Sequence, residues 1–228
     1  MNLKNKVVVI TGSTGGLGKA LAQAFIKEQA KVVINARSLK KLEQTSKEIG
    51  ASACAGDVTK ESDMQKLANF AVKKFGKIDI WINNAGINVE DAPIEKMDSN
   101  QAHRIMEVNF FGTFYGSRSA MKYMKKQKHG TFVNIISMSA LFGRPFHSTY
   151  SASKWAVRGF TEALRMALGP ENVTVIAVYP SGIKTNLFAK FKQPADYKNF
   201  MEPSFVAKKI VQNLKKQKPK EEIIIKKK

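Results

Sequence analysis

The sequence has little of what stabilises secreted or membrane-spanning proteins. Cys54 is the single cysteine among 228 residues, so no intrachain disulfide can form, which suits a reducing cytoplasm. No apolar stretch approaches the roughly 18 uninterrupted residues that a membrane-spanning helix needs. The amino-terminal segment is a poor secretory signal, because its apolar run covers only residues 7–10 and polar Thr11 follows. We therefore expect a cytoplasmic protein with no membrane span.

Metal ligands and linkers are equally scarce. Three histidines are present without the paired spacing of metal ligands, so no metal site is predicted; they are His103, His129 and His147. No Pro/Gly/Ser-rich linker divides the chain, and 43% of its residues are hydrophobic, enough for a substantial core. The sequence thus predicts one domain over residues 1–228.

Acidic residues are outnumbered, 18 against 38 basic ones, which gives a net charge of +20. Such a field attracts polyanions, and nucleic acid has to be considered. The charge is spread along the chain, with only a mild concentration over residues 208–228, and neither zinc-ligand spacing nor a basic-aromatic RNA motif accompanies it. We expect a solvated lysine-rich surface rather than a dedicated nucleic-acid site.

Short apolar, β-branched segments alternate with amphipathic segments along the whole chain. Strands are predicted over residues 7–10, 31–35, 51–56, 78–82, 131–136, 173–178 and 222–225. Helices are predicted over residues 17–29, 39–49 (capped by Ser38), 60–75, 100–126 (with a bend), 150–168 and 205–216. This alternation predicts an α/β fold, a doubly wound, Rossmann-like parallel sheet of about seven strands with helices on both faces.

Glycines gather where the first predicted strand turns into the first helix, in TGSTGGLG over residues 11–18. Glycine permits positive φ and lets the backbone approach a ligand, and the free N–H groups of the following helix bind a pyrophosphate. A tight turn without a ligand would also use glycines, but the position between a strand and an amphipathic helix favours nucleotide binding. The candidate residues are Gly12, Ser13, Gly16, Leu17 and Gly18.

Tyr150 and Lys154 are four residues apart, so they share one face of the predicted helix. The ordinary pKa of tyrosine is about 10, and a neighbouring ammonium group would lower it toward neutral pH. Such a pair also occurs by chance in many helices. Ser137 ends the fifth predicted strand and could donate to a substrate oxygen or cap a turn.

Taken in order along the whole chain, these motifs closely resemble those of the short-chain dehydrogenase/reductase family, in its compact soluble branch. TGSTGGLG is similar to the family's TGxxxGxG turn, and residues 83–86 match its NNAG motif. Asn109, in VNFFG, matches the family's helix asparagine. Ser137 matches the catalytic serine, and Tyr150 with Lys154 matches YxxxK at the usual separation of 13 residues from that serine.

The resemblance implies a catalytic set and an activity, the transfer of a hydride between NADPH and a carbonyl or alcohol carbon. Tyr150 would be the general acid in reduction and the base in oxidation. Lys154 would hold the nicotinamide ribose hydroxyls and lower the pKa of the tyrosine. Ser137 would orient and polarise the substrate carbonyl, and Asn109 would support a water that relays protons from Lys154.

A cofactor-binding set is implied in the same way. Asp57, with Val58 beside it in GDV, would contact the adenine. The middle of the cofactor would be lined by Asn83, Ala85 and Gly86, and the nicotinamide carboxamide bound by Ile183 and Thr185. One departure from the family pattern is Pro180-Ser181-Gly182 where a simple PG is common, and the other is Ser139, which competes with Ser137 at a less usual separation from Tyr150.

Cofactor choice depends on the end of the second predicted strand. An NAD enzyme needs a carboxylate there, and the resemblance assigns that position to Ala36, which is neutral. Arg37 follows, with a guanidinium suited to a phosphate, and Ser13 is a second candidate phosphate donor. Arg37 could also be a simple solvated residue, but the missing acid independently favours NADP.

The substrate is not identified by the sequence. A short lid is predicted near residues 186–203, and aromatic residues surround the site: Phe142, Phe146, Phe188, Phe191, Tyr197 and Phe200, with Leu141 and His147 beside them. They favour an apolar small molecule, although they could also pin the lid to the core. Two alternatives stay open: a 3-oxoacyl-carrier-protein reductase, mildly supported by the basic surface, and a non-catalytic NADP-sensing protein.

Two predicted helical segments, residues 110–124 and 155–168, carry apolar side chains on more than one face. A single sheet face cannot cover all of them. We therefore expect a homodimer or homotetramer.

Overall fold

The computed structural model of the protein describes residues 1–88, 92–188, 194 and 196–227, and strands alternate with helices along it. The elements are β1 (Val7–Ile10), α1 (Gly16–Lys27), β2 (Lys31–Ala36), α2 (Leu39–Ile49), β3 (Ser52–Ala55), α3 (Glu61–Phe75), β4 (Ile80–Asn83), α4 (Ser99–Met106), α5 (Gly112–Gln127), β5 (Gly130–Ile135), α6 (Ser148–Leu168), β6 (Val173–Pro180), α7 (Pro203–Lys215) and β7 (Glu222–Ile225).

One seven-stranded sheet has the order β3-β2-β1-β4-β5-β6-β7, and every neighbouring pair is parallel. The chain winds outward from β1 to β3, returns to place β4 beside β1, and then winds outward to β7. This confirms the predicted doubly wound, Rossmann-like fold. The strand order reverses between β1 and β4, and ligands of such sheets bind at that point, beyond the carboxyl ends of the strands.

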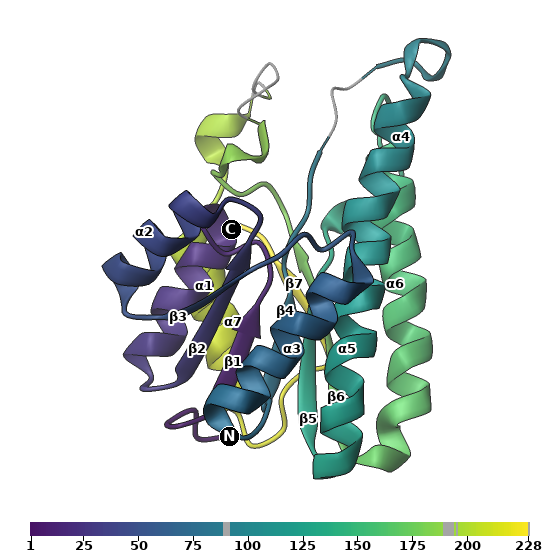
Figure 1. The fold of residues 1–228 in the computed structure, drawn as a ribbon. Helices are drawn as coiled ribbons and strands as arrows, with labels where there is room; N and C mark the ends of the chain where they lie inside the picture. The colour runs from purple at the N-terminus through teal and green to yellow at the C-terminus, as the bar shows by residue number, and fades with distance from the viewer. Residues whose placement is uncertain (89–91, 189–193, 195, 228) are drawn as a thin grey trace.

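Helices cover both faces of the sheet, as Figure 1 shows: α1, α2 and α7 lie on one face, and α3, α5 and α6 on the other. The strands are apolar throughout because both faces are buried. Val8 and Ile10 pack with the first layer and Val9 with the second, and all three are fully buried.

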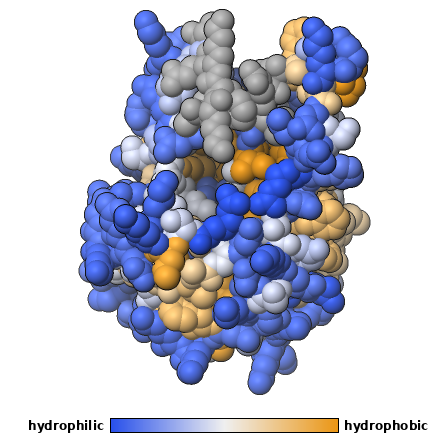
Figure 2. All heavy atoms as spheres, turned by 45° about the horizontal axis from the view of Figure 1, so that its top comes forward, coloured by the Kyte–Doolittle hydropathy of each residue, from blue (hydrophilic) through white to orange (hydrophobic). Residues whose placement is uncertain are grey.

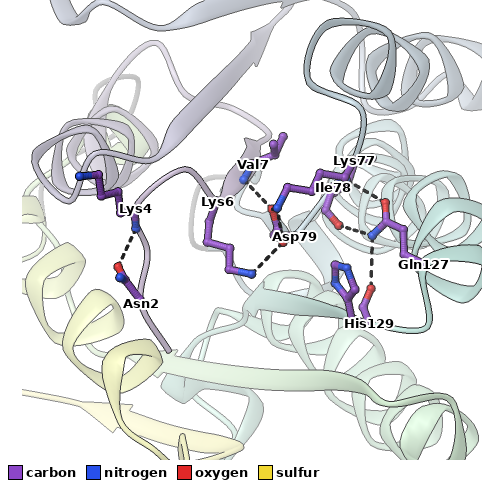
Figure 3. A network of polar contacts seen from close by, with 9 residues as sticks. All are labelled: Asn2, Lys4, Lys6, Val7, Lys77, Ile78, Asp79, Gln127 and His129. Carbon is purple, nitrogen blue, oxygen red and sulfur yellow. Dashed lines mark hydrogen bonds and ion pairs between the residues drawn. The ribbon is translucent and has the colours of Figure 1, made fainter.

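At the amino ends of β1 and β4, the buried carboxylate of Asp79 is fully partnered (Figure 3). It accepts a hydrogen bond from the backbone N of Val7 at 2.8 Å and lies 3.1 Å from the Nζ of Lys6 and 3.0 Å from that of Lys77. Beside it, the Gln127 side chain accepts a bond from the N of Ile78 at 3.0 Å and donates to its O at 2.9 Å. These contacts close the end of the sheet opposite the predicted site.

The long predicted helix over residues 100–126 differs most from its expectation. It begins at Ser99 as α4, continues through the π-helical segment Glu107–Phe111 and ends at Gln127 as α5. The other elements differ from their predicted bounds by at most two residues at either end, and the Ser38 side chain caps α2 as expected. A π-helical turn inside an α-helix is frequent at functional sites.

The predicted lid is only partly described, and Phe191 lies outside the described residues. Its described parts are short 3-10 helices, Asn186–Phe188 and Tyr197–Asn199, and a parallel bridge joins Ile183 to Met201. Within the described ranges, no helix is long and apolar enough to cross a bilayer.

Candidate active site

The glycine turn between β1 and α1 lies at the strand-order reversal. Gly12 has a φ of +63° and Gly16 a φ of +50°, in the left-handed region that favours glycine. A Cβ on Gly12 would lie 2.8 Å from the Cα of Ala85, and one on Gly18 would collide with the backbone O of Gly12. The turn therefore packs against the segment after β4 and cannot hold side chains at these positions.

Asn84 and Thr11 hold this turn in place. The sequence motifs predicted neither role. The Asn84 side chain donates to the carbonyl oxygens of Thr11 and Gly12 at 2.9 and 3.0 Å. The backbone N–H groups of Asn84 and Ala85 both donate to the Thr11 hydroxyl at 3.1 Å. The loops after β1 and β4 thus form one rigid unit.

The amino terminus of α1 is open toward a ligand. Its N-cap, Gly15, makes no side-chain capping bond, and a Cβ added there would meet no atom within 4 Å. On the other side, the Cγ2 of Thr185 lies 3.0 Å from the position of a Cβ on Gly16. Uncapped N–H groups and the helix dipole bind anions, so this cradle fits the diphosphate of a dinucleotide.

Ser13 does not fit its expected role as a phosphate donor. Its side chain is fully buried, and its hydroxyl donates to the O of Ile10 at 2.8 Å and accepts from the N of Asn35 at 2.9 Å. Its backbone N–H donates to the O of Asn35 at 3.0 Å. These bonds fasten the turn to β2, and this geometry speaks against a phosphate contact.

Several other predicted cofactor residues are buried, so only their backbone could face a ligand. Leu17 packs in the core beneath the turn, and Val58 packs against Gly112 of α5. The Asn83 side chain donates to Ser117 and Asn134 at 2.9 and 2.8 Å. Their side chains are thus used within the fold.

The adenosine end of the predicted site contains a charged cluster. The Arg37 side chain, 65% exposed, lies 4.0 Å from Oδ2 of Asp57 through its Nη1. Arg104 of α4, which no motif pointed to, reaches the same oxygen at 3.8 Å. Burial by itself raises the pKa of the Asp57 carboxyl, but bonds from Thr59 and the two arginines outweigh it and lower that pKa.

At the other end, the structure brings the expected catalytic residues together. Lys154 is 5% exposed, its Nζ lies 5.8 Å from the centre of the Tyr150 ring, and it donates to the O of Ile135 at 3.1 Å. The Tyr150 hydroxyl interacts with the Ser137 side chain. The Ser137 Oγ also accepts a bond from the N of Ser139 at 3.1 Å, so Ser137 is the serine that both caps its turn and contacts the tyrosine.

We expected the pKa of Tyr150 to be lowered, and this prediction is wrong: the pKa is raised. Burial raises the pKa of Tyr150 above its usual value, although the bond to Ser137 and the charge of Arg144 act in the opposite direction. Burial also lowers the pKa of Lys154, to about 8. Both groups lose solvation on burial, so each is shifted toward its neutral form.

Asn109 lies in the π-helical segment and bridges three parts of the site. Its Oδ1 accepts from the N of Ile87 at 2.9 Å, and its Nδ2 donates to the O of Ile87 at 3.1 Å and to the Ser153 hydroxyl at 3.0 Å. Ser153, a residue whose role was not predicted, donates in turn to the O of Tyr150 at 2.7 Å. A Cβ on Gly86 would lie 3.3 Å from the Asn109 Oδ1 and 3.6 Å from the Lys154 Nζ, which puts all three residues at one place.

The rim above these residues is partly apolar. Phe142 and Phe146 are 42% and 59% exposed, and Phe146 has a φ of +63°. His147 packs edge-on to Tyr150, with 6.2 Å between ring centres. Figure 2, which turns this end toward the viewer, shows apolar surface between hydrophilic side chains.

Comparison with protein families gives one match that covers most of the chain. Residues 6–196 match the model of the family described as short chain dehydrogenase. An uncharacterized oxidoreductase of Staphylococcus saprophyticus is 34% identical over 221 residues, which cover 92% of this chain and 89% of that protein. A second uncharacterized oxidoreductase, from Listeria monocytogenes, is 34% identical over 82% of this chain and 78% of its own length.

Solved structures agree with this match. The 3-ketoacyl-(acyl-carrier-protein) reductase of Brucella melitensis, complexed with NADH, is similar at a TM-score of 0.92 and 30% identity, covering 98% of this chain and 97% of that chain. The fold alone is shared with an alcohol dehydrogenase of Thermococcus sibiricus, complexed with 5-hydroxy-NADP, at a TM-score of 0.87 and 23% identity over 96% of this chain and 95% of that one.

Proposed function

Because the chain belongs to the short-chain dehydrogenase family, we propose that it is an NADP-dependent oxidoreductase acting on the carbonyl or alcohol carbon of a small apolar molecule. One observation carries this proposal: Tyr150 interacts with Ser137 and lies beside the buried ammonium of Lys154 at the carboxyl edge of the sheet. A protein that only senses its cofactor needs no such proton donor.

The site supports reduction at neutral pH. Because burial raises the pKa of Tyr150, its phenol stays protonated there and can donate a proton to a substrate oxygen. Ser137 contacts the Tyr150 hydroxyl and would orient that same oxygen. The bound nicotinamide would supply the hydride, and the glycine turn with the amino terminus of α1 would hold its diphosphate.

Lys154 and Asn109 would assist Tyr150 as the proton donor. With a pKa of about 8, the Lys154 ammonium is mostly protonated at pH 7 but gives up a proton far more easily than an ordinary lysine. Asn109 fixes Ile87 and, through Ser153, the first turn of the helix that carries Tyr150. Lys154 would hold the nicotinamide ribose hydroxyls and return a proton to the tyrosine, and Asn109 would support the water that relays protons from solvent to Lys154.

Cofactor preference is the most discriminating test. The end of β2 presents neutral Ala36 and the exposed guanidinium of Arg37, so we expect a higher kcat/KM with NADPH than with NADH. The preference should weaken as salt screens the phosphate contact. Replacing Ala36→Asp together with Arg37→Val should reverse it. Equal kcat/KM for the two cofactors in the unmodified protein would refute the NADP assignment.

A second candidate function is the reduction of 3-oxoacyl thioesters on an acyl carrier. The similarity to the Brucella melitensis reductase over nearly the whole chain favours it, and the net charge of +20 suits an acidic carrier. NADPH oxidation measured against aldehydes, ketones and 3-oxoacyl thioesters separates the two. Cofactor binding without turnover on any of them would instead favour a sensing protein.

A homo-oligomer remains part of the proposal. Phe111 and Trp155 are 42% and 47% exposed, and Phe111 stacks on Tyr115 of α5 with 6.0 Å between ring centres. Exposed aromatic side chains on neighbouring helices are typical of association surfaces. Light scattering at micromolar concentration should give the mass of a dimer or tetramer, and a monomer mass would refute this expectation.

A further inference from the structure

Arg37 shares its acidic neighbour, Asp57, with a second arginine, Arg104. Nη1 of Arg37 lies 4.0 Å from Oδ2 of Asp57, and Nη2 of Arg104 lies 3.8 Å from the same atom. One carboxylate oxygen is therefore shared by two guanidinium groups that come from different elements, the end of β2 and helix α4.

Both Asp57 and Arg104 are fixed by contacts of their own. The other oxygen of Asp57 accepts bonds from the backbone N and the hydroxyl of Thr59, at 3.0 and 2.9 Å. Arg104 is 37% exposed and is bonded through Nη1 to Glu107 at 3.0 Å. Arg37, by contrast, is 65% exposed, and Asp57 is its one ion-pair partner among the described residues. Of the two arginines, Arg37 is the one that can turn toward a ligand.

A phosphate bound by Arg37 would lie within one Debye length of the Asp57 carboxylate, about 10 Å at moderate salt. That carboxylate would repel the phosphate and compete for Arg37. Each effect is smaller while Arg104 offsets the same negative charge. A cofactor with a 2′-hydroxyl in place of the phosphate is insensitive to this competition.

We propose that Arg104 is a specificity-determining residue: by offsetting the charge of Asp57 it leaves Arg37 free to bind the 2′-phosphate of NADP. This inference rests on the cofactor preference proposed above. It assigns a role in cofactor choice to a residue of helix α4, far in sequence from the strand end where such choice is usually sought.

The test compares Arg104→Gln with the unmodified protein by measuring the dissociation constants of NADPH and NADH from the change in protein or cofactor fluorescence. We expect the dissociation constant of NADPH to rise about threefold to fivefold, the upper part of the range of one exposed ion pair, and that of NADH to change less than about twofold. High salt should shrink the difference, and Arg104→Lys should restore most of the NADPH affinity because it keeps the charge.

Arg118→Gln is the matched control, since Arg118 makes a comparable exposed ion pair with Glu61 at 3.0 Å and does not contact Asp57. It should leave both dissociation constants unchanged. An equal rise for both cofactors in Arg104→Gln, or no rise for NADPH, overturns the role of Arg104 while the preference of the unmodified protein stands. An unmodified protein without a preference overturns the cofactor proposal and this inference together.

Discussion

The two ends of the parallel sheet treat a buried charge in opposite ways. At the amino end, Asp79 is bonded to a backbone N–H and lies within 3.1 Å of two lysines. At the carboxyl end, Lys154 is nearly as buried, yet within the described residues it has no carboxylate partner and donates to the O of Ile135. A buried charge without a partner destabilises a fold, and it persists where chemistry requires it.

The pKa values follow the same division. Burial would raise the pKa of Asp79, but the Val7 N–H and the two lysines outweigh it and lower that pKa. For Lys154, burial is the cause and nothing opposes it, so the pKa falls to about 8. The Asp79 carboxylate thus stays ionised at neutral pH, whereas the Lys154 ammonium can give up its proton.

The largest effect should come from the proton donor at the carboxyl end. Tyr150→Phe keeps the ring but removes the transferable proton, so kcat should fall by about a hundredfold or more while NADPH still binds. Steady-state kinetics with a confirmed substrate measure this. Tyr123→Phe is the control, since that hydroxyl bonds to Asn69 on the surface and should not affect turnover. A Tyr150→Phe enzyme with nearly normal kcat would contradict the assignment.

Lys154→Met removes the unpaired charge at the carboxyl end of the sheet and so tests the contrast with Asp79. An amine whose pKa is about 8 in the folded state and about 10.4 when unfolded destabilises the fold fully below pH 8, by on the order of 3 kcal/mol. The variant should therefore be more stable than the unmodified protein at pH 7 but catalytically impaired. The gain should shrink as pH rises from 8 to about 10.4, because the unfolded lysine then loses its proton as well.

Denaturant unfolding at pH 7 and at pH 10 measures the change in unfolding free energy. If Lys154→Met is as stable as the unmodified protein at both pH values, the buried ammonium does not destabilise the fold, and the contrast with Asp79 fails.

Asp79→Asn should have a smaller effect of opposite sign, a loss of about 2 kcal/mol in unfolding free energy at neutral pH. A carboxyl whose pKa is lowered by folding stabilises above its unfolded value of about 3.9 and loses that contribution as pH falls through the folded value. The two proteins should therefore converge in acid. Thermal unfolding from pH 7 to pH 3 measures it.

Glu48→Gln is the matched control for that experiment, because the Lys19–Glu48 pair at 2.7 Å is exposed and should contribute less than about 0.5 kcal/mol. An Asp79→Asn protein that loses no more stability than this control would show that the amino end does not depend on its paired charge.

The fold could be predicted because its signals are local. Continuous apolar strands such as Val7–Ile10, glycine at the first turn and the Ser38 cap each identify an element from neighbouring residues alone. A bend was expected in the helix over residues 100–126, and the structure has a π-helical segment within it that was not predicted. Whether a helix adopts a π turn depends on what Asn109 contacts across the fold, and those contacts are not visible in a linear pattern.

Candidate site residues were found where a motif carries them, and not where a role arises from packing. Tyr150 and Lys154 stand out by their spacing, but their pKa directions follow from burial, which spacing does not reveal. Arg104 has no motif at all and is identified only by its distance to Asp57. Ser13 sits in the right motif, yet its hydroxyl is used within the fold.

The π-helical segment Glu107–Phe111 fixes the rotational phase between α4 and α5. Each helical residue turns its successor by about 100° and advances it by about 1.5 Å. Loss of one residue here would yield a smoother helix, yet it would turn either Arg104 away from Asp57 or Asn109 away from Ile87. Tolerance to insertions and deletions should therefore be lowest in this segment, although the seven strands behind it would keep their register.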